Sequence, residues 1–373
     1  MSYDHLAAAD AVAVLAREHA ARVDAKAEFP KHSIDAAREH GLFGLISSAE
    51  VGGRGLGLRQ AAEVIERLAR ECGSTAMIMT MHYSGVAVVE KYGSAQTRRA
   101  IASGQHLSTL AFSESGSRSH FWAPLSTARV EGAHAVLDAS KSWITSASHA
   151  DAYVWSSQTS GAQGPSSLWL VDRTTPGLSI DGGFDGIGLR GNDSAPVKAA
   201  GARVPLERRL GADGEGFGIM MQTVLPLFSV LISAGSVGMM EAAVAKTAEH
   251  AGGMKYAHLN NSPLSELPTI RAYIARMRIQ TDMARALWLD TLAALEAGRA
   301  DAMLRVLEVK AATAESAREV LDTAMRVCGG QAFRKDVGVE RRFRDTRAAL
   351  IMAPTSDQLY DFIGKAACGL PLF

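Results

Sequence analysis

Residues 111–154 read AFSESGSRSHFWAPLSTARVEGAHAVLDASKSWITSASHADAYV. The second half alternates apolar with small or polar residues, which predicts β-strands, and Gly132 and Asp138 are predicted turn positions. The stretch contains Lys141-Ser-Trp-Ile-Thr145, in which a tryptophan stands beside hydroxyl residues. A flat apolar face next to hydrogen-bonding groups suits a planar polar heterocycle that must be both stacked and oriented. Taken alone, a strand tryptophan indicates core packing, so the neighbouring motifs have to decide.

The composition predicts a soluble protein with two or three packed units. The chain has 373 residues, and Lys+Arg and Asp+Glu are both 39, which gives no general attraction to nucleic acid or to an anionic membrane. The three cysteines form no CxxC pair, which predicts core packing and a reducing, cytoplasmic compartment. We predict no metal site. The first 30 residues carry acids throughout and no window reaches 18 apolar residues, so we expect neither a signal peptide nor a membrane span.

The pattern along the chain changes from helices to strands and back to helices. Apolar periodicity and Gly or Pro boundaries predict helices over 6–27, 30–40, 58–72, 74–92, 217–250, 268–297, 300–328 and 348–362. Short apolar runs between turn signals fill residues 109–210. This order predicts an α+β protein with an N-terminal helical domain (1–108), a middle β-barrel or sandwich (109–210) and a C-terminal four-helix bundle (211–373). The glycine-rich run 51–57 lacks the context of a phosphate loop and is predicted to be a turn.

Several motifs in this order resemble the acyl-CoA dehydrogenase family. Ser113-Glu114, Ser119, the KSWIT run and Ala150-Asp151 are similar to the flavin-binding strands of that family, and the passage from 188 to 217 follows its strand-to-helix connection. The resemblance covers nearly the whole chain. It implies the same three-part fold, FAD held between the β-domain and the bundle, and a dimer or tetramer.

The resemblance also implies roles for single residues. It places Ser113 near the pyrimidine end of the flavin, Trp143 beside the ring and Thr145 near its N5 atom. The remaining matches are Ser119, Gly329 and Gly330 (at the adenine half of FAD, from a neighbouring subunit), Thr355, and Arg344, Asp345 and Arg347 of the R-D-x-R motif. A helix-start ion-pair network is an equally good explanation of the arginines.

The departures from the family concern proton removal and the pyrophosphate. The family's catalytic Glu falls on Ala353, and its alternative position, on the first long helix of the bundle, falls on Phe228 or Ser229. A positioned general base supplies about 10²–10⁴-fold in rate, so its loss needs a replacement. Asp357 and His120 are the candidates, although Asp357 also fits a helix N-terminal acid.

One further family motif is missing, and several residues near the matching motifs have a structural explanation. The R-x-x-F-G motif, whose Arg holds the FAD pyrophosphate, is missing, and Lys255 or His258 would have to replace it. Glu114 is expected to be structural and His82 a hydrogen-bonded core residue. Met77, Met79, Met81 and Tyr83 belong either to a pocket wall or to the core.

The resemblance implies an FAD-dependent oxidoreductase that desaturates an acyl thioester, from coenzyme A or a carrier protein, to the enoyl product. It would need an external electron acceptor, because no NAD fingerprint is present. Two alternatives stay open without the Glu. One is a flavin-dependent monooxygenase on the same fold, and the other is a non-catalytic subunit of a hetero-oligomeric acyl-CoA dehydrogenase.

Overall fold

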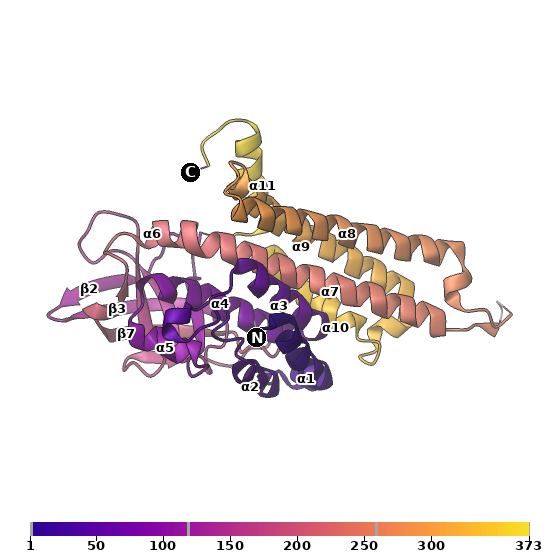
Figure 1. The fold of residues 1–373 in the computed structure, drawn as a ribbon, viewed down its shortest axis with the longest axis horizontal. Helices are drawn as coiled ribbons and strands as arrows, with labels where there is room; N and C mark the ends of the chain where they lie inside the picture. Colours follow the sequence, from indigo (N-terminus) through magenta and orange to yellow (C-terminus); the bar gives the residue numbers. More distant parts are fainter. Residues whose placement is uncertain (1–2, 118–119, 258–259, 373) are drawn as a thin grey trace.

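The protein is described by a computed structural model that covers residues 3–117, 120–257 and 260–372. Figure 1 shows two β-sheets at one end of an elongated molecule and a bundle of long helices that extends from them to the other end. The N-terminal helices pack alongside the junction of these two parts, so both the sheets and the bundle contact them.

Five helices form the N-terminal part: α1 (His5–Lys26), α2 (Lys31–Glu39), α3 (Leu58–Glu71), α4 (Gly73–Tyr92) and α5 (Ala95–Ala102). The four predicted helices are confirmed to within two residues at each end, while α5 was not separately predicted. Helix α1 begins where the Asp4 carboxylate accepts hydrogen bonds from the backbone N–H groups of Leu6 and Ala7. Helix α4 is buried along most of its length, as its all-round apolar sequence predicts.

His82 of α4 is a core residue, as expected. Its ring is fully buried, with Nε2 3.1 Å from the Phe43 carbonyl and Nδ1 accepting from the Ser108 N–H at 3.2 Å. Burial lowers its pKa to about 3, so the imidazole is neutral near pH 7. Both ring nitrogens are occupied by backbone groups, which explains its place in the helix without catalysis.

The middle part contains two four-stranded sheets. One has the order β1-β4-β5-β8 and the other β2-β3-β7-β6. The strands are β1 (Ser108–Ala111), β2 (Thr127–Glu131), β3 (His134–Ile144), β4 (Ala152–Ser157), β5 (Ser167–Asp172), β6 (Leu178–Ile180), β7 (Ala195–Pro205) and β8 (Arg209–Leu210). Trp155 and Trp169 face each other across β4 and β5 and are fully buried, so they anchor the core of the first sheet.

Asp138 is not a turn, contrary to the sequence prediction, whereas Gly132 does lie in the β2–β3 turn. Asp138 lies inside β3, where the pairing register with β7 shifts between Leu137 and Ala139. Its Oδ1 accepts the backbone N–H of Gly201 at 2.7 Å. A turn-forming residue is tolerated here because the extra β7 residue leaves a backbone donor outside the ladder, and the Asp138 carboxylate accepts from it.

The C-terminal part is the predicted four-helix bundle of α7 (Leu225–Gly253), α8 (Pro268–Glu296), α9 (Ala302–Cys328) and α10 (Val339–Ile351). Helix α6 (Gly216–Ile219) and a π-helical turn (Met220–Val224) lead into α7, and α11 (Ser356–Ala367) follows the bundle. The predicted helix over 348–362 is therefore wrong. Pro354 lacks a backbone N–H and interrupts it, and Thr355 caps a new helix by accepting from the Gln358 N–H.

Helix α7 is central to the bundle. The continuous helical segment Gly216–Gly253 is long and apolar enough to span a membrane, but 61% of its most apolar window is buried inside the protein. It packs against α3, α8 and α9. Its apolar character is explained by this surrounding, because a helix covered on all sides has no polar face.

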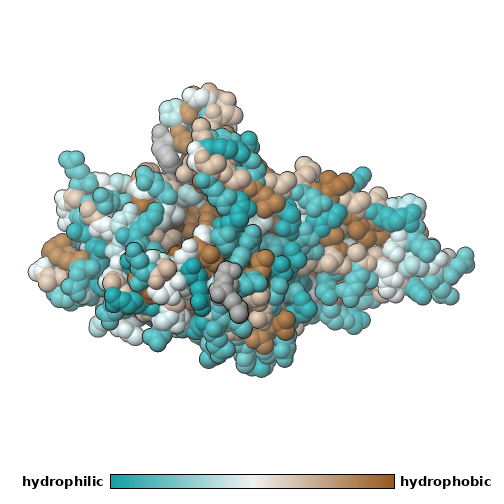
Figure 2. Space-filling view, viewed as in Figure 1, coloured by the Kyte–Doolittle hydropathy of each residue, from teal (hydrophilic) through white to brown (hydrophobic). Residues whose placement is uncertain are grey.

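Helix α8 carries apolar side chains on its outer face. Ile279, Met283 and Leu289 are exposed there. Figure 2 shows apolar surface on this part of the bundle. A face of this kind is typical of a contact with another protein surface.

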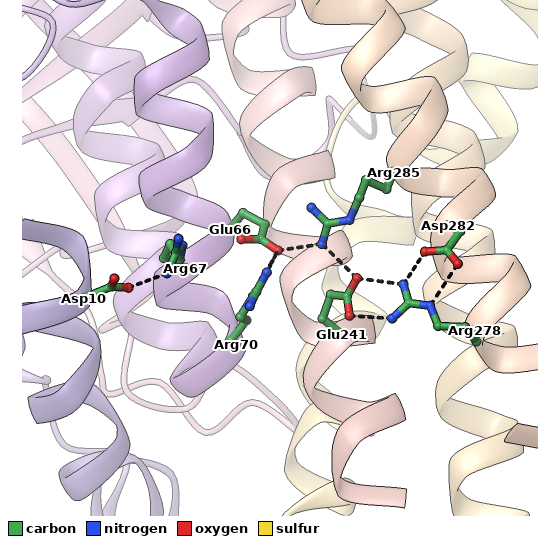
Figure 3. Close-up of polar contacts among 8 residues, drawn as sticks. All are labelled: Asp10, Glu66, Arg67, Arg70, Glu241, Arg278, Asp282 and Arg285. Carbon is green, nitrogen blue, oxygen red and sulfur yellow. Dashed lines mark hydrogen bonds and ion pairs between the residues drawn. The ribbon is translucent and has the colours of Figure 1, made fainter. Parts of the chain in front are cut away.

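A chain of ion pairs joins the N-terminal helices to the bundle (Figure 3). Glu66 of α3 is nearly buried and accepts from Arg70 at 2.7 Å and from Arg285 of α8 at 2.8 Å. Arg285 also contacts Glu241 of α7 at 2.9 Å, and Glu241 in turn holds Arg278 of α8 at 2.7 Å. Helix α3 is thus tied to α7 and α8 by shared charges rather than by isolated pairs.

Replacing Arg285 by Met should lower the free energy of unfolding by roughly 1.5–3 kcal/mol at pH 7, because two charged hydrogen bonds are lost. The hydrogen bond from Arg278, with further help from Arg285, lowers the pKa of Glu241 to about 2. A depressed carboxylate pKa contributes stability above the unfolded value near 4.5 that disappears as the pH falls toward 2. The deficit of the variant should therefore shrink between pH 4.5 and pH 2.

Urea unfolding at several pH values measures this deficit. Arg276→Met is the matched control, because Arg276 lies exposed on the same helix with no described partner. Equal deficits for the two variants, or a deficit at Arg285 that is independent of pH, would contradict the assignment.

Candidate active site

A cavity of about 770 Å³ lies where the sheets, α4, α7 and α10 meet. One wall is formed by the end of β3 and the segment that follows β1, and a second by residues 184–189. The remaining walls come from the start of α7 and the end of α10. The sheet side carries hydroxyl groups, and the bundle side is mostly apolar apart from Arg344 and Arg347. The apolar residues that line the bundle side are Val224, Leu225, Phe228, Ala348, Ile351, Met352 and Ala353.

Trp143 lies in the wall of this cavity in an unusual backbone conformation. The register between β3 and β7 shifts between Lys141 and Ile144, so β3 contains one extra residue there. Trp143 has φ of +56°, which a bulky residue rarely adopts, and 67% of it is exposed. Its ring meets Phe184 edge to face at 6.2 Å between centroids. The bulge turns the indole out of the core into the cavity, and such strained positions concentrate at functional sites.

Hydroxyl groups surround the indole. Ser113, Ser142, Thr145 and Ser194 all line the cavity, and the side-chain oxygens of Thr145 and Ser194 lie 3.4 Å apart. Together with the exposed indole they form a flat apolar surface beside hydrogen-bonding groups that can both donate and accept. This donor set fits a planar heterocycle with nitrogen and oxygen atoms at its edge, such as the flavin ring.

A buried ion pair fixes the strand that carries Trp143. The Lys141 ammonium and the Glu114 carboxylate are in direct contact, and both residues are buried. Lys141 also donates to the carbonyl of Ser156 at 2.7 Å and to its hydroxyl at 3.0 Å. Burial lowers the pKa of Lys141 to about 8, against the opposing effect of Glu114. Glu114 further accepts from the N–H of Ser126 at 3.0 Å, so the expected structural role is what the contacts show.

Asp345 and Arg344 hold the wall formed by residues 184–189. Asp345 is buried and accepts the Leu189 N–H at 2.6 Å, and burial raises its pKa to about 6. Arg344 donates to both carboxylate oxygens of Asp24, to Glu340 and to the Ile187 carbonyl. Arg344 thus takes part in an ion-pair network, as one of the two explanations of these arginines predicts, and Arg344 and Arg347 also line the cavity.

Replacing Gly188 by Ala should destabilise the protein by about 1–3 kcal/mol and reduce the amount of flavin that stays bound, because the added methyl overpacks the wall. A Cβ atom at Gly188 would lie 2.7 Å from the Asp345 nitrogen and closer still to the Arg344 carbonyl. Gly183→Ala is the control, since nothing lies within 4 Å of a Cβ there. Urea unfolding measures the loss of stability, and the flavin-to-protein absorbance ratio measures the loss of flavin. Equal values for the two variants would contradict tight packing of Gly188 against α10.

The wall where proton removal is expected carries no free carboxylate among the described residues. Ala353 lines the cavity, and so does Phe228, whereas the neighbouring Ser229 is buried outside the lining. Of the described lining residues only Glu114 and Asp185 are acids. Glu114 is taken by Lys141, and Asp185 is exposed and paired with Arg190 at 3.1 Å.

The remaining predicted site residues lie outside the described lining. Asp357 is exposed in the first turn of α11, and His120 is exposed with its ring 5.2 Å from that of Trp122. Thr355 is the cap of α11. Gly329 and Gly330 are exposed at the end of α9, with open space at each Cβ position. Lys255 forms an isolated antiparallel β-bridge with Pro263 in the loop after α7. Ser119 and His258 lie outside the described residues.

Sequence reasoning missed most of the cavity wall formed by residues 184–189. Its glycines were visible, but nothing in the sequence indicated that this segment reaches across to α10. Ser194 was also missed, and Ser142 was expected only as a hydroxyl residue beside the tryptophan, without a role of its own. Ser142 stands inside the KSWIT run and could have been found by asking which side a bulge would turn it to.

Family models match the chain almost from end to end. The acyl-CoA dehydrogenase N-terminal domain matches residues 3–104, the middle domain residues 109–200 and the C-terminal domain residues 214–368. The chain belongs to the acyl-CoA dehydrogenase family. The predicted α+β class is confirmed as well.

Individual relatives in this family are similar over most of their length. The chain is 31% identical over 347 residues to human mitochondrial short-chain specific acyl-CoA dehydrogenase, covering 91% of this chain and 82% of that protein. It is 28% identical over 364 residues to cyclohex-1-ene-1-carbonyl-CoA dehydrogenase of Geobacter metallireducens, covering 95% and 94%. The solved glutaryl-coenzyme A dehydrogenase complex with glutaryl-CoA has a TM-score of 0.91 at 24% identity, covering 100% and 97%, which shows the shared acyl-CoA dehydrogenase fold.

Proposed function

We propose that this protein is an FAD-dependent acyl-CoA dehydrogenase that desaturates an acyl thioester between its α and β carbons. The observation that carries the proposal is a single cavity with two kinds of wall. Trp143 and the hydroxyl groups of Ser113 and Thr145 face it from the sheets, and apolar side chains such as Phe228 face it from the bundle. A flavin ring and an acyl chain need these two surfaces side by side.

Ser113, Trp143 and Thr145 would hold the flavin ring, with Ser119 and Thr355 as further predicted contacts. Gly329 and Gly330 are proposed to receive the adenine half from a neighbouring subunit, since they are exposed and leave open space. When bound, FAD supplies the acceptor for the hydride that leaves the β carbon. The α proton passes to a base, a carbon–carbon double bond forms, and an external acceptor takes the two electrons.

The proton acceptor remains a prediction. Asp357 and His120 are the proposed residues. Both lie near a cavity-lining residue in the sequence: Asp357 comes four residues after Ala353, and His120 comes directly before Phe121. Asp357→Asn and His120→Gln variants would slow reduction of the bound flavin by about 10²-fold or more if the residue is the base.

The same proposal includes partners and compartment. The exposed apolar residues of α8 support a homo-oligomer, a dimer or tetramer. The substrate would be an acyl-CoA, as the names of the relatives suggest, or an acyl group on a carrier protein. Cys72, Cys328 and Cys368 are all free thiols, which supports a reducing cytoplasm.

The deciding experiment is an anaerobic titration of the purified protein with a panel of acyl-CoA thioesters, followed by the visible absorbance of the flavin. Bleaching by some thioester is the expected result. A protein that binds no flavin and no acyl thioester would overturn the proposal. A flavin band that no thioester bleaches would favour oxygenase chemistry or a subunit that needs a catalytic partner.

A further inference from the structure

Lys310 is a fully buried lysine in the middle of α9, and no described residue forms an ion pair with it. Its Nζ atom donates to three backbone carbonyls, of Ala349 at 3.2 Å, Met352 at 3.0 Å and Pro354 at 2.7 Å. An ammonium group has three N–H donors and no acceptor, so these three carbonyls match its full capacity. The geometry therefore describes a protonated lysine bound to one short backbone segment.

One of the three carbonyls, that of Ala349, lies in the last turn of α10, and those of Met352 and Pro354 lie in the break between α10 and α11. Helix α10 ends at Ile351 and α11 begins at Ser356. The last carbonyls of a helix have no partner within the helix and carry the negative end of its dipole. Lys310 thus places a positive charge where α10 needs both a donor and a cation. Its partners lie 39–44 residues further along the sequence, so these hydrogen bonds connect α9 to the segment 349–354. We call this connection the Lys310 clasp.

The segment held by Lys310 is the cavity wall at the position of the missing Glu. Ile351, Met352 and Ala353 all line the cavity, while Lys310 itself is not part of the lining. Any effect of Lys310 on a ligand must therefore pass through the backbone that it holds. We propose that Lys310 is a positioning residue, whose ammonium group sets the place of Met352 and Ala353 against the acyl group; the acyl group rests on the proposed function.

The cost of burying this lysine supports a positioning role. Burial is the one cause that shifts its pKa, which falls to about 7. Arg347 of α10 and Asp357 of α11, the charged residues that flank the held segment, form no described contact with it. A methionine of similar length would avoid the desolvation of an unpaired ammonium, so packing alone does not explain a lysine here. The three carbonyl contacts do.

Hydrogen exchange of the Lys310→Met variant tests the clasp without any ligand. Amides over 349–358 should exchange at least about tenfold faster than in the parent protein, because opening of this segment no longer breaks charged hydrogen bonds. The rest of α9 should keep its protection. Lys365→Met is the matched control, since Lys365 lies on the neighbouring α11 and pairs with the exposed Asp361. Lys310→Gln restores two N–H donors and should fall between parent and Met variant.

Ligand binding then separates positioning from stability. With an acyl-CoA that perturbs the flavin spectrum of the parent, Lys310→Met should bind about tenfold more weakly at unchanged flavin content, and Gln should recover part of the loss. Unchanged exchange over 349–358 in the Met variant, or equally fast exchange in Lys365→Met, overturns the proposal. If Lys310→Met fails to fold, a Gln variant that folds with parental exchange also overturns it. If no thioester binds the parent protein, the proposed function fails while the exchange result still decides the clasp.

Discussion

Replacing Ala353 by Glu should accelerate anaerobic reduction of the bound flavin by an acyl thioester about 10²–10⁴-fold, the range that a positioned general base supplies. Ala353 lines the cavity, and it is the position at which the resemblance to the family predicts the catalytic Glu. Among the described lining residues no free carboxylate serves this wall, and the two proposed bases, Asp357 and His120, lie outside that lining. The gain reaches the full range where neither Asp357 nor His120 takes the proton in the parent protein. The Glu side chain would extend into this cavity of about 770 Å³, because Ala353 is part of its lining.

The proper control is Ala353→Gln, which has nearly the same shape as the Glu variant but cannot take up a proton. Stopped-flow measurements of flavin absorbance, with the thioester that bleaches the parent protein best, give the rate for all three proteins. The Gln variant should react no faster than the parent. Equal rates for Glu and Gln would mean that proton removal does not limit the reaction or that another base already performs it.

The sign of the pH dependence provides a second test of the same variant. A carboxylate base is active only when ionised, so the rate of Ala353→Glu should rise with pH through the pKa of the new side chain. The apolar neighbours Phe228, Met352 and Ile351 raise that pKa above the ordinary value by desolvation. A rate for the Glu variant that does not vary with pH would show that the new carboxylate takes no part.

The elements that the sequence predicted correctly are those whose signals are local. Glycine or proline marks both ends of α2, and a short continuous apolar run marks β5 around Trp169. The failures have local causes too. Asp138 is a residue type common in turns, but here its carboxylate accepts the N–H of Gly201 at a bulge in the neighbouring strand β7. Pro354 was visible in the sequence, but the predicted helix was continued across it. A boundary can be predicted when the residue that causes it acts on its own backbone.

The residues of the site also differ in whether their signal in the sequence is local. Trp143, Ser113 and Thr145 could be predicted because they stand in two motifs that follow each other in the order of the family, and all three line the cavity. Lys310 could not, because its partners lie 39–44 residues away and are carbonyls that carry no side-chain signature. The wall at 184–189 is held by Asp345, 156 residues from Leu189. Contacts between distant side chain and backbone leave no pattern in a single sequence.

Replacing Glu114 by Gln should lower the free energy of unfolding by about 3–5 kcal/mol at pH 7, the usual result of removing one partner of a buried ion pair. Glutamine keeps an oxygen that can accept the Ser126 N–H, so the loss isolates the charge. Lys141 would remain buried, with Ser156 as its remaining neutral partner. Because Lys141 lies two residues before Trp143 on β3, flavin retention should fall together with stability.

The pH dependence distinguishes a charge effect from a packing effect. The pKa of Lys141 is about 8 in the folded protein and near 10.5 unfolded, and loss of Glu114 would lower the folded value further. A lysine with a lowered folded pKa makes folding more favourable as the pH rises, because the unfolded state then binds more protons. The deficit of Glu114→Gln should therefore be smaller at pH 9 than at pH 7, as measured by urea unfolding.

Two further variants serve as controls for Glu114→Gln. Glu131→Gln removes an exposed carboxylate that pairs with Arg129 and Arg203, and should cost less than about 1 kcal/mol. The double variant Glu114→Gln with Lys141→Met should recover most of the stability, because no unpaired charge is left in the core. If the double variant is no more stable than Glu114→Gln alone, the shape of this region and not the ion pair holds the strand of Trp143 in place.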